Sequence, residues 1–351
     1  MSSHRILITG GSGYLGGTLL ARWKDANLPA YDKLYASVRS DHQAEAVEKR
    51  YGAEALRLDL DDEMAVRKGI VENNITIVYF LTDALRGKAQ VYFIKALAEV
   101  KKATGLEVHF LHTSGAKIFS SHAAAVTDRP LLDTDPDLYS MQKSQIQDTR
   151  FDIFKEAVGT NCTVVEEAER QGVRSYIFTP CVVYGKGEGF GNIISIQTVA
   201  IVQAAKAMKR MYKVDEGRPI WPVCHVIDNT TLYIQILRKI LNGEYPGHGR
   251  NGYFLAASGS VGWDDIYTAM ASALAKRNVI DDASVVPASK QILEQMGTAM
   301  GCPADFVTVQ IGGHCTFTAE HGKEIGWKPQ FAPEHIIEYA DTEVETILEN
   351  M

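Results

Sequence analysis

The sequence predicts an α/β protein with a doubly wound parallel sheet and a smaller, mainly helical C-terminal region. Short β-rich runs alternate with stretches of period near 3.6 in the first half, a glycine-rich turn follows the first run, and longer helical stretches dominate after residue 183. Alternation of this kind implies right-handed β-α-β crossovers, which build a parallel sheet covered on both faces. We therefore expect a sheet domain at 1–183 and an interleaved helical region at 184–351.

The predicted elements follow this pattern along the chain. Strands are expected at 6–9, 34–38, 55–58, 77–81, 108–112 and 175–179, where apolar and β-branched residues cluster. Helices are expected between them at 14–24, 64–71 and 91–102, and later at 194–210, 229–241, 263–275 and 333–348. The section 121–163 is less regular and contains one helix of uncertain position.

Composition and charge exclude several classes of protein. The chain has 351 residues, with 36 Lys plus Arg against 43 Asp plus Glu, so its formal charge is −7. A negative total argues against a protein that binds nucleic acid through a basic surface. Apolar residues make up 46% and charged residues 23%, which is typical of a globular protein with a large core.

Targeting signals and cysteine usage indicate a cytoplasmic protein. The N-terminus has no apolar run followed by a cleavage site, which predicts the absence of a signal peptide. No window offers about 18 consecutive apolar residues, so no membrane span is expected. The five cysteines are widely spaced and lie outside any C-x-x-C pattern, which indicates reduced, packing cysteines.

The strongest motif follows the first predicted strand and opens the first helix. It satisfies both G-x-G-x-x-G and T-G-x-x-G-x-x-G and consists of Thr9, Gly10, Gly11, Ser12, Gly13, Tyr14, Leu15 and Gly16. Glycines let the backbone turn tightly and approach a pyrophosphate, and the helix N-terminus supplies N–H groups and a positive dipole end. The sequence therefore predicts a Rossmann-like dinucleotide site.

Two residues at the ends of later strands bear on which dinucleotide binds. Arg39 ends the second predicted strand, where NAD-binding proteins usually carry an acid for the ribose diol. A guanidinium suits a 2′-phosphate, so NADP is favoured over NAD, although the nearby Asp41 keeps NAD possible. Asp59, after the third strand, is placed to accept from the adenine amino group or, alternatively, to cap a helix.

These residues resemble the extended short-chain dehydrogenase/reductases, which include nucleotide-sugar epimerases, dehydratases and dihydroflavonol reductases. The resemblance continues through the segments 111–115, 179–185 and 225–229, and it is nearest to atypical fungal members known as NAD-dependent epimerase/dehydratase-like proteins. It implies a nicotinamide cofactor and a substrate over the C-terminal edge of the sheet. Further cofactor contacts implied by the resemblance are Leu60, Leu81, Thr82, Pro180 and Val183.

In that family a Y-x-x-x-K pair and a hydroxyl from the fifth strand carry the chemistry. The tyrosine exchanges a proton with the substrate oxygen, and the lysine lowers the pKa of the tyrosine. Tyr139 and Lys143 form the literal match in the expected region, and Ser114 supplies the hydroxyl that polarises the carbonyl. The resemblance thus implies a catalytic triad of Ser114, Tyr139 and Lys143.

Spacing keeps other assignments open. Lys143 and Pro180 are 37 positions apart, more than expected when the pair's helix leads directly into the sixth strand. Counting back from residues 164–173, which look like the end of that helix, brings up Phe151 with Lys155, or Cys162. A second route pairs Lys117 with Tyr139, as in progesterone 5β-reductase-like relatives that reduce an enone. Tyr139 and Lys143 also fit an ordinary i, i+4 pair on a solvated helix face.

The substrate pocket is expected to involve side chains that follow the fourth and sixth strands, together with one histidine. These are Asp83, Cys181, Tyr184, Phe190 and His225. Asp83 fits a helix cap equally well. The histidines show no ligand spacing, so no metal site is expected.

Together these features predict an NADP(H)-dependent oxidoreductase that acts on a ketone, an aldehyde or a secondary alcohol of a mid-sized organic molecule. One alternative is an epimerase, dehydratase or isomerase that retains its NAD(P) without net consumption. Another is a catalytically silent NAD(P)-binding sensor. The expected partner is a small-molecule substrate, without nucleic acid or membrane, and the family permits a homodimer.

Overall fold

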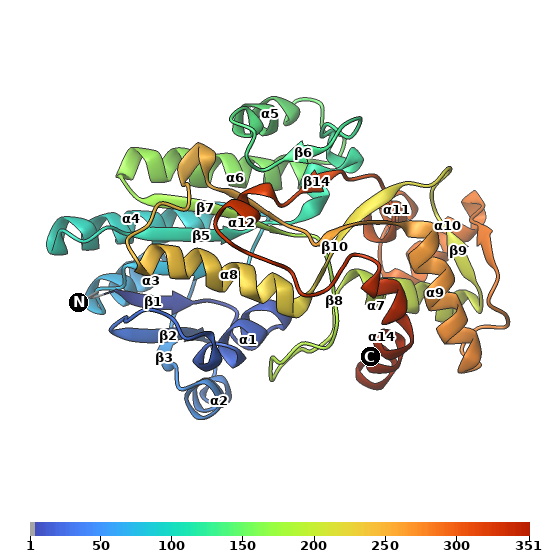
Figure 1. Ribbon diagram of the computed structural model, residues 1–351, viewed down its shortest axis with the longest axis horizontal. Helices are drawn as coiled ribbons and strands as arrows, with labels where there is room; N and C mark the ends of the chain where they lie inside the picture. Colours follow the sequence, from blue (N-terminus) through green and yellow to red (C-terminus); the bar gives the residue numbers. More distant parts are fainter. Residues whose placement is uncertain (1–3) are drawn as a thin grey trace.

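A computed structural model describes residues 4–351 and contains a central parallel sheet of seven strands (Figure 1). Residues 1–3 lie outside the described residues; the predicted sheet domain begins there, and the predicted absence of a signal peptide partly concerns them. The strand order is β11-β7-β5-β4-β1-β2-β3. The strands are β1 (Arg5–Ile8), β2 (Lys33–Val38), β3 (Glu54–Arg57), β4 (Ile77–Phe80), β5 (His109–Thr113), β7 (Arg174–Pro180) and β11 (Tyr253–Ala256).

The predicted fold class is confirmed. The six predicted strands agree with the structure to within one residue at each end. Ile6, Leu7 and Ile8 of β1 are completely buried, because a parallel strand covered on both faces is apolar along its whole length. The strand order reverses between β1 and β4, and ligands of such sheets bind beyond the carboxyl ends of the strands at this point.

Helices cover both faces of the sheet. One layer consists of α1 (Tyr14–Ala21), α2 (Asp41–Tyr51) and α8 (Val226–Leu241), and the other of α3 (Glu63–Glu72), α4 (Lys88–Thr104) and α6 (Asp152–Gln171). Helix α2 was not predicted, although Ser40 caps it by accepting a hydrogen bond from the Gln43 N–H. Helix α8 comes from the second half of the chain and joins the sheet, since the Tyr79 hydroxyl donates to the Tyr233 carbonyl.

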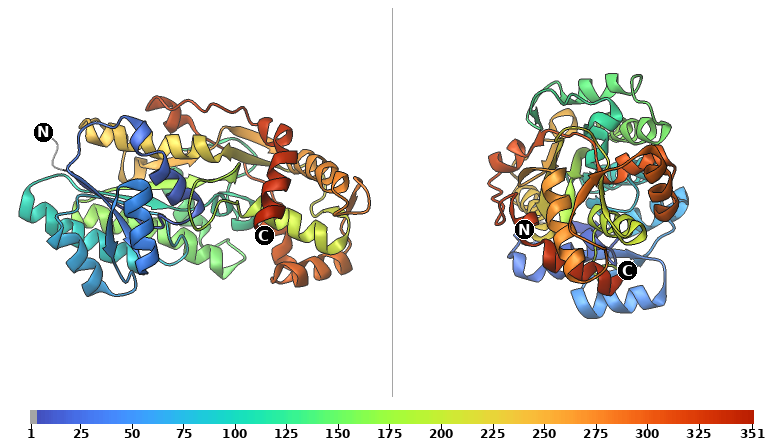
Figure 2. Two further views of the ribbon diagram at one scale, coloured as in Figure 1. Left: turned by 90° about the horizontal axis from the view of Figure 1, so that it is seen from below. Right: turned by 90° about the vertical axis from the view of Figure 1, so that its right-hand side faces the viewer.

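The C-terminal region packs against the carboxyl ends of the strands (Figures 1 and 2). Its helices are α7 (Gln197–Met208), α9 (Trp263–Lys276), α10 (Lys290–Met300), α11 (Ala304–Ile311), α12 (Glu320–Glu324), α13 (His335–Glu338) and α14 (Ala340–Asn350). A three-stranded sheet joins β8 (Val182–Tyr184), β10 (Ile220–His225) and β12 (Gly259–Gly262), and β9 (Met211–Lys213) pairs with β13 (Val285–Pro287). The region therefore mixes helices with small sheets.

An additional segment between β5 and α6 forms a layer outside the sheet domain. It contains β6 (Leu131–Leu132), which pairs with β14 (Phe317–Thr318), and α5 (Leu138–Gln145), which lies against α6 on the side away from the sheet (Figure 1). The buried Asp133 carboxylate accepts hydrogen bonds from the N–H groups of Leu255 and His321. Burial raises the pKa of Asp133 to about 7. The segment is thus anchored to the C-terminal region.

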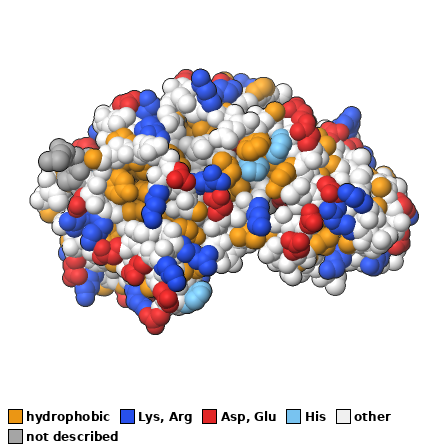
Figure 3. Space-filling view, turned by 60° about the horizontal axis from the view of Figure 1, so that its bottom comes forward, with side chains coloured by type: hydrophobic (Ala, Val, Ile, Leu, Met, Phe, Trp, Pro, Cys, Tyr) orange, Lys and Arg blue, Asp and Glu red, His pale blue; other side chains and the backbone are white. Residues whose placement is uncertain are grey.

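The surface carries charges of both signs (Figure 3). Acidic and basic side chains are interspersed over the face that Figure 3 shows, without a large patch of one sign. Across residues 4–351, no helix combines the length and apolar character that crossing a membrane requires.

Candidate functional site

Two adjoining hollows lie beyond the carboxyl ends of the strands. The first, here called the nucleotide pocket, has a volume of about 210 Å³ and is lined by the glycine loop, β2, α2 and the end of β3. The second, the apolar cleft, has a volume of about 610 Å³ and extends between the sheet, α6, α11 and the segment before α7. Gly10 lines both hollows, so a single extended ligand can reach from one to the other.

The glycine loop has the conformation that the motif predicts. Gly10 has a φ of +70°, a region that favours glycine. A Cβ added at Gly16 would lie 2.4 Å from the Gly10 carbonyl oxygen, so this position requires glycine for the helix to pack against the turn. The Thr9 hydroxyl accepts a hydrogen bond from the Leu81 N–H at 2.8 Å and links the loop to the end of β4.

The electrostatics of the nucleotide pocket suit a phosphorylated ligand. Gly13 is the N-cap of helix α1 and provides no side-chain cap, and the first turn has no acidic residue. The N-terminal N–H groups of the helix are thus left for an anion. Of the side chains that line the pocket within residues 4–351, Arg39 alone carries a formal charge. The residues present therefore fit a dinucleotide.

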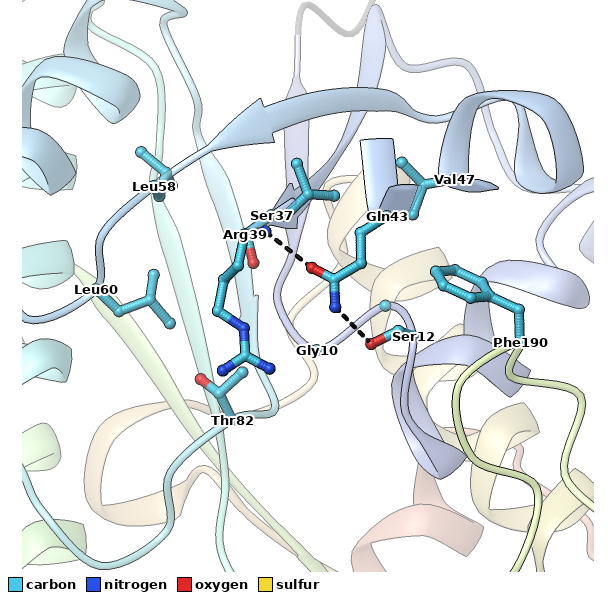
Figure 4. A pocket seen from close by; sticks show the side chains of 12 residues that line it. Gly10, Ser12, Ser37, Arg39, Gln43, Val47, Leu58, Leu60, Thr82 and Phe190 are labelled. Carbon is cyan, nitrogen blue, oxygen red and sulfur yellow. Dashed lines mark hydrogen bonds between the residues drawn. The ribbon is translucent and has the colours of Figure 1, made fainter. Parts of the chain in front are cut away.

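Arg39, between β2 and α2, is held at the pocket by Gln43 in the first turn of α2. The Arg39 N–H donates to Gln43 Oε1 at 2.8 Å, and Gln43 Nε2 donates to the Ser12 hydroxyl at 3.4 Å (Figure 4). The exposed guanidinium projects into the pocket, whereas the Asp41 carboxylate forms an ion pair with Arg57. This arrangement leaves a positive charge rather than a carboxylate at the pocket.

The other predicted cofactor residues divide between the two hollows. Leu60 and Thr82 line the nucleotide pocket, and Leu81, Pro180 and Val183 line the apolar cleft. Asp59 lines neither hollow; it lines a neighbouring one that shares Arg39 and Leu60 with the nucleotide pocket. The alternative that Asp59 caps a helix is wrong, because its carboxylate accepts from the Asp61 N–H in a turn, and Asp62 caps α3.

The apolar cleft is bounded by aliphatic and aromatic side chains from distant parts of the chain. They include Leu85, Ile118, Ile153, Phe154, Ala157, Cys181, Ile196, Phe306 and Val309. Leu85 and Ile196 are exposed, which places apolar groups in contact with solvent among the cleft residues. Such a lining favours a ligand with a large apolar surface.

Lys117 brings a charged group into this apolar surrounding. It is the one side chain with a formal charge among the cleft-lining residues of the described part of the chain. Its ammonium donates to Gln310 Oε1 of α11 at 3.0 Å and has no carboxylate partner within residues 4–351. Burial lowers the pKa of Lys117 to about 8, because an apolar environment disfavours the charged amine.

Ser114 supplies a hydroxyl to the same cleft. It follows β5, and its N–H donates to the Phe178 carbonyl at 2.7 Å, which fixes the backbone at the sheet edge. Its side chain lines the cleft together with Lys117, and within residues 4–351 its hydroxyl has no hydrogen-bond partner. Ser114 is thus available to a ligand.

The structure contradicts the predicted triad. Tyr139 and Lys143 lie on α5 and not on the helix that leads into β7, and both bond Glu166 Oε1 at 2.5 Å. Glu166 is nine residues along α6 from the cleft residue Ala157, a separation of roughly 14 Å. Burial and the Glu166 carboxylate raise the pKa of Tyr139 to about 12, the opposite of what a proton donor requires. Tyr139 and Lys143 therefore fasten α5 to α6.

The structure does not support the alternative catalytic residues either. On α6, apolar Ile153 and Ala157 face the cleft with the i, i+4 spacing of the family pair. Phe151 packs against Phe306, Lys155 pairs with Asp152, and neither lines the cleft. Cys162 is likewise absent from the cleft lining. The Lys117–Tyr139 pair is not formed, since the partner of Lys117 is Gln310.

Of the predicted substrate residues, only Cys181 lines the apolar cleft among the residues described. The predicted substrate contact of Asp83 is wrong, because Asp83 does not line the cleft and its carboxylate instead accepts hydrogen bonds from the N–H groups of Leu85 and Arg86 in the following turn. The predicted substrate contact of Tyr184 is also wrong, because this side chain is buried and its hydroxyl is hydrogen-bonded to His335 Nδ1.

The remaining two predictions for the substrate site are also wrong. His225 instead caps α8 by accepting from the Ile227 N–H, and its ring packs against Phe331. Phe190 lies in the nucleotide pocket and not in the cleft (Figure 4).

Several residues at the site escaped the sequence reasoning. Gln43 could have been found, since Ser40-x-x-Gln43 matches a capping-box pattern at the start of a helix. A second run of alternating glycines, Gly185, Gly187, Gly189 and Gly191, was also visible. Gln310 gave no signal, because only folding brings α11 to the cleft.

Comparisons with known proteins agree with this geometry. The model of the NAD dependent epimerase/dehydratase family matches residues 6–248. No curated protein matches the chain significantly.

Solved structures share the fold over nearly the whole chain. The UDP-glucose 4-epimerase of Thermotoga maritima, solved with UDP-glucose, is 15% identical with a TM-score of 0.62, covering 98% of this chain and 99% of that chain. Vestitone reductase from alfalfa is 15% identical with a TM-score of 0.58, covering 97% and 98%. The dTDP-glucose 4,6-dehydratase of Streptomyces venezuelae, solved with NAD, is 12% identical with a TM-score of 0.64, covering 99% and 97%.

At these identities the structural likeness establishes the fold, and the family match establishes the relationship. The glycine loop, the charge at the nucleotide pocket and the matched residues 6–248 all lead to one assignment. The chain belongs to the NAD dependent epimerase/dehydratase family.

Proposed function

We propose that the protein is an NADP(H)-dependent oxidoreductase that acts on the carbonyl group, or the corresponding secondary alcohol, of a mid-sized and largely apolar small molecule. The observation that carries this proposal is the position of Lys117, a single ionisable amine in an apolar cleft that adjoins the nucleotide pocket. In this proposal Lys117, and not Tyr139, exchanges the proton.

The cofactor preference is supported by the charges at the nucleotide pocket. The guanidinium of Arg39 offers a 2′-phosphate a favourable partner, and the carboxylate of Asp41, which could bind a ribose diol, is paired with Arg57. NADP is therefore proposed over NAD. Asp59, beside Arg39, is proposed to contact the adenine.

The residues of the cleft have distinct roles in this mechanism. A bound nicotinamide would supply or accept the hydride at the substrate carbon. The Ser114 hydroxyl donates a hydrogen bond to the substrate oxygen and polarises the carbonyl. Lys117 Nζ gives its proton to that oxygen as the alcohol forms, and takes one in the reverse direction. The apolar walls exclude water from the reacting atoms.

The lining of the cleft also bears on the substrate class. A sugar nucleotide carries many hydroxyls and two phosphates, each of which needs a polar partner when it is buried. The cleft offers mainly hydrocarbon surface. Its polar side chains are hydroxyls and amides together with one amine, and they belong to Tyr14, Ser114, Lys117, Asn192, Ser195, Gln197 and Gln310. This composition favours a compound with one or two oxygen functions on an apolar skeleton.

The test measures NADPH consumption with a panel of apolar ketones and aldehydes, and with UDP-glucose as a polar comparison. Lys117→Met keeps the apolar stem and removes the amine, so reduction should slow by about 100-fold or more. Lys143→Met is the matched control, because Lys143 pairs with Glu166 outside the cleft, and its turnover should stay within about twofold of wild type.

Three outcomes would contradict the proposal. Equal turnover of Lys117→Met and wild type would remove Lys117 from the chemistry. Conversion of UDP-glucose without net NADPH consumption would indicate an epimerase. Tight NADPH binding without reduction of any carbonyl compound would indicate a sensor.

A further inference from the structure

A second glycine-rich segment lies directly on the glycine loop. Residues 185–192, here called the clasp, connect β8 with the chain that leads to α7. The N–H groups of Gly191 and Asn192 both donate to the Ser12 carbonyl, at 2.9 and 3.2 Å. A Cβ added at Gly189 would lie 2.2 Å from the Gly13 carbonyl oxygen. The alternating glycines of the clasp thus allow two backbones to pack without side chains between them.

Side chains from both halves of the molecule fix the clasp. Glu188 forms a two-point ion pair with Arg22, the residue that follows α1, at 2.7 and 2.6 Å, and its N–H donates to the Thr18 hydroxyl. At the other end, the Gly185 N–H donates to the buried Glu343 carboxylate of α14. Because Glu188 and Gly191, whose N–H donates to the Ser12 carbonyl, are both anchored, the position of the residue between them is defined.

That residue is Phe190. Its ring lies among side chains of α2, with the Tyr51 ring 6.1 Å away and the Arg50 guanidinium over its face at 5.7 Å. It lines the nucleotide pocket, in which Arg39 and Leu60 project from the side opposite the clasp (Figure 4). The pocket therefore has an aromatic wall that comes from the second half of the chain.

We propose that the clasp completes the adenosine half of the cofactor site and that Phe190 is the residue that holds the base. This inference rests on the proposed binding of NADP(H), and it assigns Phe190 the adenine ring and Arg39 the 2′-phosphate. An aromatic side chain suits this role because every base presents a π-face for stacking. The hydrocarbon surfaces of Val47 and Leu58 line the same pocket and accommodate a flat heterocycle.

The experiment uses half-ligands and does not depend on turnover. Calorimetry measures the binding of 2′,5′-ADP and of nicotinamide mononucleotide to wild type and to Phe190→Ala. Loss of the ring should weaken 2′,5′-ADP about tenfold and leave nicotinamide mononucleotide unchanged. Phe190→Tyr, which retains a ring, should restore the wild-type affinity. Phe331→Ala is the matched control, since Phe331 is also a half-buried phenylalanine but lines neither hollow.

A second variant distinguishes loss of the aromatic ring from a folding defect caused by the empty space in Phe190→Ala. Phe190→Leu fills most of the space without a π-face, and it should also weaken 2′,5′-ADP several-fold. Wild-type affinity in both Phe190→Ala and Phe190→Leu would overturn the assignment, and so would an equal loss for the two half-ligands, which would indicate a displaced glycine loop. If wild type binds 5′-AMP as tightly as 2′,5′-ADP, the NADP preference is wrong, and the same Phe190 comparison is then read with 5′-AMP.

Discussion

The nucleotide pocket and the apolar cleft meet at Gly10, but they relate to the family in opposite ways. The pocket retains the glycine motif, an uncapped helix N-terminus and a charged residue at the end of β2. The cleft has apolar Ile153 and Ala157 at the spacing of the family's tyrosine and lysine, and its amine comes from Lys117 after β5. The comparison teaches that the two hollows can differ from the family independently, because different secondary structure elements line them.

The largest expected effect contrasts two glycines that both line the apolar cleft, one from the glycine loop and one that follows β5. Gly16→Ala places a Cβ against the Gly10 carbonyl oxygen, a backbone atom that cannot move aside, whereas Gly115→Ala meets no atom within 4 Å. Overpacking of this kind costs about 1–3 kcal/mol, so NADPH affinity should fall by roughly 5- to 150-fold in Gly16→Ala only. Calorimetry with NADPH measures both variants. Equal affinities would show that the nucleotide pocket does not need the glycine turn.

The second prediction concerns the pH dependence of the cleft. Burial lowers the pKa of Lys117 to about 8, so its ammonium is lost as pH rises through that value. The rate of reduction needs the charged donor and should fall about tenfold per pH unit above 8, whereas the rate of oxidation should rise up to the same pH. Initial rates between pH 6 and pH 10 (about 0.5-unit steps) test this expectation. Any residual activity of Lys117→Met should lack this pH transition. If the transition persists in the variant, it belongs to another group.

A smaller effect is expected at the nucleotide pocket. Arg39→Ala removes the positive charge of the pocket, and NADPH affinity should fall about tenfold while NADH affinity remains unchanged. The guanidinium is exposed, so raising the salt concentration should reduce the difference between wild type and variant. Titrations of both cofactors at two salt concentrations provide the measurement. An equal loss for NADH and NADPH would contradict a 2′-phosphate contact.

The smallest effect lies outside both hollows. Tyr139→Phe removes the hydrogen bond to Glu166, which is partly exposed, so the free energy of unfolding should fall by about 1 kcal/mol. Turnover should remain unchanged, because Tyr139 does not line the cleft. Urea unfolding and steady-state rates separate the two quantities. A large loss of turnover at unchanged stability would restore Tyr139 to the catalytic site.

The glycine loop was predictable because its signal is local. The turn, the strand before it and the helix after it lie within about a dozen consecutive residues, and each requires its residue type for reasons of backbone geometry alone. Arg39 and the six strand positions were readable for the same reason. Helix α2 was missed although its Ser40 cap is also a local signal.

The assignment of Tyr139 as the catalytic residue failed because the spacing of two residues on a helix does not determine which part of the protein their helix face packs against. Tyr139 and Lys143 have the i, i+4 spacing of the family pair, but any helix brings such residues onto one face. The 37 positions between Lys143 and Pro180 pointed to the additional helix α5, yet the sequence alone could not place it outside α6. Tertiary packing decided that the pair faces Glu166.

The sequence by itself determined the α/β fold class, the dinucleotide loop and the positive charge beside it, since these depend on residues close together in the chain. Only the tertiary structure decided that Lys117 meets Gln310 in the cleft and that Phe190 reaches the nucleotide pocket. Each of these contacts joins segments more than 130 residues apart. Their formation depends on how the C-terminal region packs over the carboxyl edge of the sheet, and no local pattern encodes that packing.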